Sequence, residues 1–103
     1  MSTATPARAE HAVLVLREDA DGIARLTLNR PAARNALSME MMAALQARLD
    51  AIAGERAVKC VILAAAGPGF CAGHDLKQMM ANKGDAAYYR RVFETCSALM
   101  TSI

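Results

Sequence analysis

The spacing of apolar residues changes twice along the middle of this 103-residue chain, and these changes constrain its fold more than any other feature. Residues 23–28 alternate between apolar and polar side chains, as a half-buried β-strand does. Residues 42–52 carry apolar side chains at intervals of three and four, the period of one helical face. Residues 60–66 form a continuous apolar run short enough for a strand. This order predicts a βαβ unit, and therefore an α/β fold with two parallel strands.

A β-hairpin is predicted at the start of this unit. Residues 13–17 read VLVLR, a second candidate strand, and the residues 19–22 between the two strands end in Gly22. Glycine supplies the positive φ that hairpin turns often need. We therefore expect strands at 13–17 and 23–28, with a turn at 19–22 between them. Three side chains of the second strand should share its buried face: Ala24, Leu26 and Leu28.

The predicted central helix has recognisable ends. Ser38 stands where its hydroxyl can accept a hydrogen bond from an unpaired backbone N–H. Gly54 follows the last apolar position and is a plausible end of the helix, because glycine tolerates the left-handed conformation common just past a helix. The run at 60–66 has no polar face, so we expect a strand buried on both faces. Four side chains form the helical face that should cover the sheet: Met42, Leu45, Leu49 and Ile52.

Two further helices are predicted after a glycine-rich loop at residues 67–75. The first is short, at about residues 76–80, with Asp75 as its N-cap, and the second begins near Asp85. The second helix carries an apolar stripe that reaches the final residue, so we expect the chain to stop inside a helix whose apolar face has no partner. An isolated chain of this kind should be marginally folded or self-associated. The stripe consists of Tyr88, Val92, Cys96, Leu99 and Ile103.

Composition and charge exclude several classes of function. Twelve basic and ten acidic residues are interleaved, so the basic stripe that nucleic-acid binding needs is absent from the sequence. Two Tyr, two Phe and no Trp leave few side chains to stack on bases. No apolar run approaches the roughly 20 residues of a membrane-spanning helix. We expect residues 1–12 to be a flexible amino-terminal segment and residues 13–103 to form one domain.

The three cysteines are odd in number and widely spaced, which argues against a secreted disulfide framework. We therefore predict a reducing compartment, the cytoplasm or, in a eukaryote, the mitochondrial matrix. Cys60 and Cys96 lie on apolar faces and are predicted to be small core residues. Cys71 and His74 could form half of a zinc site, but the sequence holds no second Cys/His pair, so no metal is expected.

The loop at residues 67–75, GPGFCAGHD, leads from a predicted strand into a predicted helix. Its glycines miss the dinucleotide-binding spacing, and Gly73 is followed by His-Asp rather than the Lys-Ser/Thr of a phosphate-binding P-loop. Two interpretations remain open from the glycines alone. One is an anion or oxyanion site made by main-chain N–H groups, and the other, which the glycines alone favour, is a structural turn.

Three segments together resemble the enoyl-CoA hydratase/isomerase family. They read LTLNRPAARNAL at residues 26–37, VIL at 61–63 and FCAGHDLKQM at 70–79. The two longer segments have the family's character and lie the right distance apart, and the likeness extends from about residue 13 to the end. The resemblance implies a crotonase-like ββα-spiral, of which this chain would hold the amino-terminal part: a β-hairpin, a βαβ unit and carboxy-terminal helices. It also implies a homo-oligomer, a trimer or dimer of trimers, for the full-length protein.

The family's common chemistry implies a role for His74. Family members stabilise the enolate of a CoA thioester with two backbone N–H groups, one of which belongs to the residue after an Ala-Gly pair, here His74. CoA is then part of the acyl-CoA substrate, and no separate cofactor is expected. Arg34 and Lys77 are candidate partners for the CoA phosphates, with an ordinary surface charge an equal alternative. The implied substrate-binding residues are Ala33, Arg34, Ala36, Ala72, Gly73, His74, Asp75, Leu76 and Lys77.

The family's second oxyanion donor and its acid/base carboxylates lie further along the chain than residue 103. Glu40, Glu55 and Glu94 stand in the wrong context to replace them. We therefore expect a hydratase-like enzyme acting on 2-enoyl-CoA thioesters, with the 103-residue chain by itself inactive. The resemblance covers hydratases, isomerases, dehalogenases, thioesterases and decarboxylases alike. The alternative function is a non-catalytic fragment that serves as a CoA-binding or oligomerisation module.

Overall fold

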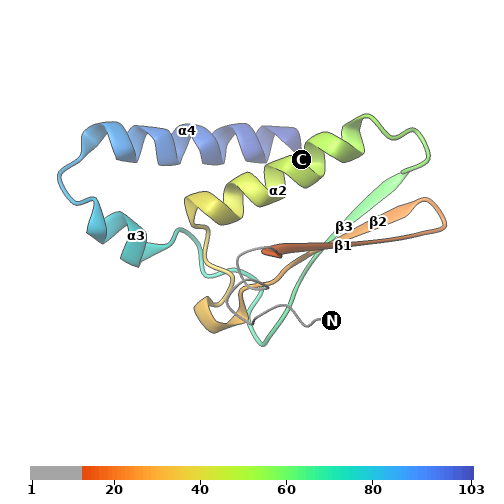
Figure 1. Cartoon of the computed structure of the whole chain (residues 1–103), viewed down its shortest axis with the longest axis horizontal. Helices are drawn as coiled ribbons and strands as arrows, with labels where there is room; N and C mark the ends of the chain where they lie inside the picture. The colour runs from red at the N-terminus through yellow and green to blue at the C-terminus, as the bar shows by residue number, and fades with distance from the viewer. Residues whose placement is uncertain (1–12) are drawn as a thin grey trace.

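The computed structural model describes residues 13–103 and contains one three-stranded sheet (Figure 1). The prediction for residues 1–12 lies outside the described residues. The strands are β1 (Val15–Ala20), β2 (Ile23–Leu28) and β3 (Cys60–Ala65), in the order β1-β2-β3. β1 is antiparallel to β2, and β2 is parallel to β3. The hairpin and the parallel strand pair predicted from the sequence are therefore confirmed.

Four helical segments accompany the sheet: η1 (Pro31–Ala33), α2 (Met39–Ala53), α3 (Leu76–Ala81) and α4 (Ala86–Ser102). The two long helices, α2 and α4, lie side by side on one side of the sheet (Figure 1). Their apolar side chains meet those of β1 and β2 in a single core. This is an α/β arrangement with the helices over one face of a small mixed sheet.

The hairpin turn is shorter than predicted and lies later in the chain. β1 begins at Val15 rather than at residue 13, and it runs to Ala20, which pairs with Ile23. The turn consists of Asp21 and Gly22, with φ of 53° and 81°. A two-residue turn with positive φ at both positions matches the natural twist of paired strands, so pairing continues to the end of β1. Residues 19 and 20, expected in the turn, are therefore in the strand.

α2 packs on the sheet through the predicted apolar face, to which Met41 is added. The Ser38 hydroxyl accepts from the Met41 N–H at 3.0 Å, so the predicted N-cap is confirmed. Met41 is also fully buried, beside the predicted Met42 and Leu45, because a helix packed against both a sheet and another helix buries a wider stripe. Gly54 is the C-cap, so the predicted end of the helix is confirmed, although its φ of −90° is right-handed rather than left-handed.

β3 is buried on one face only, which corrects the expectation of a strand buried on both faces. Val61 and Leu63 pack against the core, whereas Cys60 is exposed and Ile62 is 41% exposed. The reason is the position of β3 at the sheet edge, with α2 and α4 on one side of the sheet. An unbroken apolar run therefore alternates in burial, and Cys60 is not a core residue.

α4 finds a partner within the described chain, contrary to the prediction of an unpartnered face. The Asp85 carboxylate caps the helix by accepting from the Tyr88 N–H at 3.0 Å. Tyr88, Val92 and Leu99 are buried in the core against α2, and Cys96 packs at its margin, as expected. Ile103, the last member of the stripe, is 64% exposed. In the described part of the chain no helix is long and apolar enough to cross a membrane.

Candidate functional site

The loop that follows β3 returns to the segment that follows β2, and the two are joined through their main chains. The Leu37 N–H donates to the Gly73 carbonyl at 2.7 Å, and the Asp75 N–H donates to the Leu37 carbonyl at 3.1 Å. A further bond of 3.0 Å runs from the Ala72 N–H to the Arg34 carbonyl. The two segments that resemble the enoyl-CoA hydratase/isomerase family therefore form one structural unit.

The main-chain N–H of His74 points out of this unit. Leu37 and His74 form a parallel bridge, in which Leu37 bonds the residues on either side of His74. Among residues 13–103, the His74 N–H donates to no main-chain acceptor. Gly73 has a φ of 92°, a conformation that glycine adopts without strain. The loop thus holds a main-chain donor in a fixed direction, as an oxyanion site requires.

Asn35 holds the other end of the loop and was given no role in the sequence analysis. Its side chain is fully buried, and its amide NH₂ contacts the carbonyls of Ala66, Gly69 and Phe70 at 3.0–3.1 Å. Its Oδ1 accepts from the Arg30 N–H at 2.7 Å. Asn35 has a φ of 56°, and asparagine tolerates this left-handed conformation better than most residues. That preference, in an Asn just before a helix, was the available signal.

Gly67 lets the loop pack directly on the segment after β2. Its φ is 84°, and a Cβ at this position would lie 2.7 Å from the Pro31 Cβ. Any larger residue would therefore push the loop away from η1, in addition to straining the backbone. Close approach at Gly67 and the hydrogen bonds of Asn35 together fix where the loop runs before it reaches His74.

Asp75 is a structural residue in this fold, as its predicted N-cap role implies. Its carboxylate accepts from the Gln78 N–H at 3.1 Å and pairs with the Arg30 guanidinium at 2.9 Å. The Gln78 N–H, and then Arg30, hold the pKa of Asp75 below its usual range against the opposing effect of burial. Neither bond involves His74, so the two neighbours form no catalytic dyad.

Gln78 connects α3 to the start of α2. Its Oε1 accepts from the Met39 N–H at 2.8 Å, and its Nε2 donates to Glu40 at 2.8 Å. The Gln78 amide is the main reason that the pKa of Glu40 is lowered. A general acid needs a raised pKa, so Glu40 is unsuited to that task. Glu55 is engaged by Arg17 at 2.7 Å, and Arg17 lowers its pKa in the same way.

The remaining predicted binding residues lie within the joined segments and differ in their burial. Ala36 is buried, Ala33 is half-buried at the end of η1, and Arg34 is exposed with a φ of 52°. Leu76 and Lys77 are exposed on the first turn of α3, and Ala72 and Gly73 are exposed in the loop. The exposed members are accessible to a ligand around His74. Among residues 13–103, no cluster of three or more His, Cys, Asp or Glu side chains could hold a metal ion.

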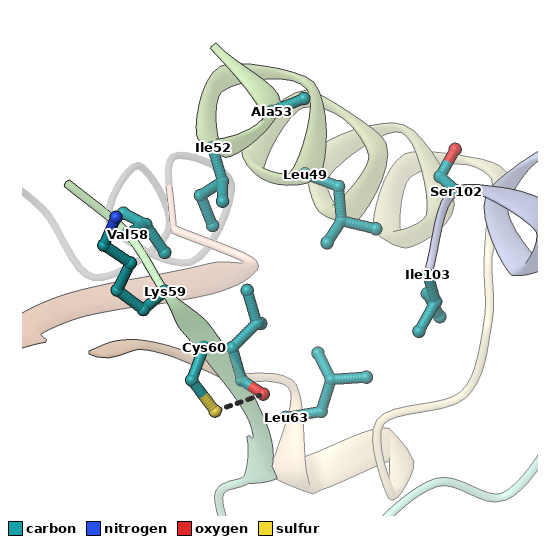
Figure 2. A pocket seen from close by; sticks show the side chains of 10 residues that line it. Leu49, Ile52, Ala53, Val58, Lys59, Cys60, Leu63, Ser102 and Ile103 are labelled. Atoms are coloured by element: carbon teal, nitrogen blue, oxygen red, sulfur yellow. Dashed lines mark hydrogen bonds between the residues drawn. The ribbon is translucent and has the colours of Figure 1, made fainter. Parts of the chain in front are cut away.

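Two pockets flank the core, and neither contains His74. One, of about 620 Å³, adjoins the Arg30–Asp75 ion pair and includes Glu40 and Gln78. The other, of about 550 Å³, opens between the carboxy-terminal end of α2, β3 and the end of α4 (Figure 2). Figure 2 shows Leu49 and Leu63 pointing into the second pocket, which is lined mainly by apolar side chains.

A hairpin, a βαβ unit and two helices, with a main-chain donor where the two joined segments meet, make up the amino-terminal part of a crotonase fold. The crystal structure of enoyl-CoA hydratase from Mycobacterium smegmatis superposes with a TM-score of 0.83 at 46% identity, covering 87% of this chain and 35% of that one. Human enoyl-CoA hydratase domain-containing protein 3 superposes with a TM-score of 0.80 at 36% identity.

The sequence comparison agrees with the structural one. A model of the enoyl-CoA hydratase/isomerase family matches residues 23–103, and the chain belongs to this family. The human protein named "Enoyl-CoA hydratase domain-containing protein 3, mitochondrial" is 41% identical over 83 residues, 81% of this chain and 27% of that protein. Enoyl-CoA hydratase EchA19 of Mycobacterium tuberculosis is 52% identical over 52 residues, 50% of this chain and 20% of that protein. The chain thus spans about a quarter of the length of the human relative.

Proposed function

We propose that this chain supplies one oxyanion donor and one wall of the CoA site to a hydratase-like enzyme that hydrates or isomerises 2-enoyl-CoA thioesters. The observation that carries the proposal is the His74 N–H, held outward by the Leu37 bridge. A thioester oxygen gains negative charge as the enolate forms, and a donor aimed at it in advance stabilises that charge. Removing one such donor typically lowers kcat by about 10²–10³-fold.

The rest of the reaction needs groups that the described residues do not provide. Gln78 and Arg17 lower the pKa values of Glu40 and Glu55, so neither carboxyl is suited to act as a general acid. We assign the second oxyanion donor and the acid/base carboxylates to the part of the relatives' length that this chain does not span. For the whole protein we propose a trimer or dimer of trimers, in the cytoplasm or, in a eukaryote, the mitochondrial matrix.

The test is a titration of the ¹⁵N-labelled chain with crotonyl-CoA and, separately, with free CoA. Crotonyl-CoA should shift the amide resonances of Gly73, His74 and Asp75, and the His74 amide should respond to the thioester much more than to free CoA. Shifts confined to residues far from this loop would contradict the proposal. Equal responses of His74 to both ligands would favour the alternative, a CoA-binding module without an oxyanion role.

A further inference from the structure

A short hydrogen-bonded ladder holds the His74 loop against the start of α2, and a side chain completes it. The Leu37 N–H donates to the Gly73 carbonyl at 2.7 Å, and the Asp75 N–H donates to the Leu37 carbonyl at 3.1 Å. The next bond of a parallel pair would run from the Met39 N–H to the Asp75 carbonyl. That carbonyl already accepts a bond of 3.1 Å from within α3. The Met39 N–H donates instead to a side chain of α3, at 2.8 Å.

The side chain that completes the ladder is Gln78, and the capping of α3 leaves it available. Asp75 and Gln78 have the spacing of a capping box, in which the Gln side chain normally bonds back to the N–H of the capping residue. The Asp75 carboxylate does accept from the Gln78 N–H, at 3.1 Å. The Asp75 N–H, however, is bonded to Leu37. The Gln78 amide therefore extends to α2, where it accepts from Met39 and donates to Glu40.

We infer that Gln78 is a positioning residue, which acts through the loop to fix the direction of the His74 N–H. The inference rests on the proposed function. The bridge at Leu37 consists of two bonds that meet at one residue, so by itself it allows the loop to twist about that residue. The Gln78 bond to Met39 lies further along the same ladder and opposes this twist. Direction matters because a donor stabilises an oxyanion only where it is aimed at the developing charge.

The first measurement is the backbone order parameter of the His74 amide, from ¹⁵N relaxation of the 103-residue chain, and it requires no activity. The wild-type value should be that of rigid backbone, about 0.85, and Gln78→Ala should lower it below about 0.6. Gln46→Ala is the matched control, because the Gln46 amide also makes two bonds, each of 2.9 Å, to Asp50 and Ser102. These partners lie on α2 and α4, so the control should leave the His74 value unchanged.

An exchange of acid and amide between two positions separates positioning from general damage. Gln78→Glu places a second carboxylate beside Glu40, and the repulsion should lower the His74 order parameter as Gln78→Ala does. Adding Glu40→Gln restores the pair, because the carboxylate at position 78 can accept from both the amide at position 40 and the Met39 N–H. The double variant should therefore regain the wild-type order parameter.

The catalytic consequence is measured in the full-length protein that carries this segment, with crotonyl-CoA as substrate. Gln78→Ala should lower kcat by about ten- to a hundredfold, less than deletion of the donor itself, because the N–H is misdirected rather than lost. The Kd for free CoA should change by less than about twofold, since the misdirected donor faces the thioester. The double variant should regain kcat, and Gln46→Ala should match the wild type.

The outcomes separate this inference from the proposed function. An unchanged His74 order parameter in Gln78→Ala overturns the inference alone. A loss of kcat that is matched by a loss of CoA affinity, or a double variant that behaves like Gln78→Ala, also overturns it, because the role is then merely structural. A wild-type protein that does not hydrate crotonyl-CoA overturns the proposed function, and the catalytic role of Gln78 falls with it.

Discussion

In the proposed site, His74 acts through its main-chain N–H. Its N–H is directed by Gly73 and Leu37, neither of which depends on the imidazole. Asn35 acts on the site indirectly, because its amide binds the carbonyls at the other end of the loop. Loss of the His74 N–H should therefore lower catalysis, whereas substitution of Asn35 should lower the stability of the fold.

In the full-length protein that carries this segment, His74→Ala should keep most activity on an unsubstituted 2-enoyl-CoA. His74→Pro removes the N–H and should lower kcat by roughly two to three orders of magnitude. Steady-state kinetics measure both, and the affinity for CoA controls for distortion of the loop by proline. If Ala is as harmful as Pro while CoA still binds, the imidazole takes part in the chemistry and the main-chain assignment is wrong.

Asn35→Ala should destabilise the fold by about 2–4 kcal/mol, because it removes the donor from three part-buried hydrogen bonds and places alanine in a left-handed conformation. Urea unfolding followed by circular dichroism measures the change. Asn82→Ala is the matched control, since Asn82 donates one bond of 2.8 Å to the Gln78 carbonyl. The control should cost no more than about 1 kcal/mol. Equal losses of unfolding free energy in the two variants would show that Asn35 does not hold the loop in place.

Side-chain hydrogen bonds and one ion pair fix how α3 and α2 lie against the loop. Asp75 caps α3 and binds Arg30 just after β2, while Gln78 reaches from α3 to the first turn of α2. These bonds depend on ionised or polar groups at the ends of helices. The packing of α4 on α2, by contrast, rests on buried apolar side chains such as Val92 and Leu99.

The Asp75 bonds make stability depend on pH. Because the folded pKa of Asp75 is lowered, its contribution is present above the unfolded pKa of about 4 and is lost as pH falls through the folded value. Glu40, whose pKa is also lowered, acts in the same direction. Urea midpoints should therefore fall between pH 5 and pH 3, at about the range where carboxylates titrate. Asp75→Asn should be less stable at pH 7 and should lose less on acidification; an unchanged pH slope would contradict the assignment.

The molecule leaves apolar surface on two sides of its compact core. The outer edge and one face of β3 are uncovered among the described residues, and Ile62 there is 41% exposed. Phe93 and Met100 are exposed on α4, and the apolar pocket of Figure 2 opens beside β3. An open strand edge with exposed apolar side chains is a template for pairing with another chain.

We expect the 103-residue chain to self-associate reversibly. Sedimentation velocity should show an average mass that rises with concentration. Ile62→Lys places a charge on the exposed face of β3 and should reduce association without changing the circular dichroism spectrum. A matched Arg25→Lys change, on the neighbouring strand, should have no effect. A sharp monomer boundary at all concentrations would show that these surfaces are not adhesive.

The sequence by itself determined which elements form, in which order, and the N-caps of the three α-helices. Ser38, Asp75 and Asp85 cap their helices as predicted. Ala24, Leu26 and Leu28 in β2 are buried as the alternation of the strand indicates. Such features depend on residues within about one helical turn or on the period of a strand, so they can be seen in a linear pattern. The motif around His74 was visible for the same reason.

The tertiary structure decided what depends on residues far apart in the chain. Whether the apolar run at 60–66 is covered on one face or two depends on its neighbours in the sheet, not on its composition. The role of Asn35 depends on carbonyls more than 30 residues away, and the orientation of the His74 ring depends on Phe93. Long-range contacts of this kind form only when the whole chain packs, because no local sequence pattern specifies which distant residue a given side chain will contact.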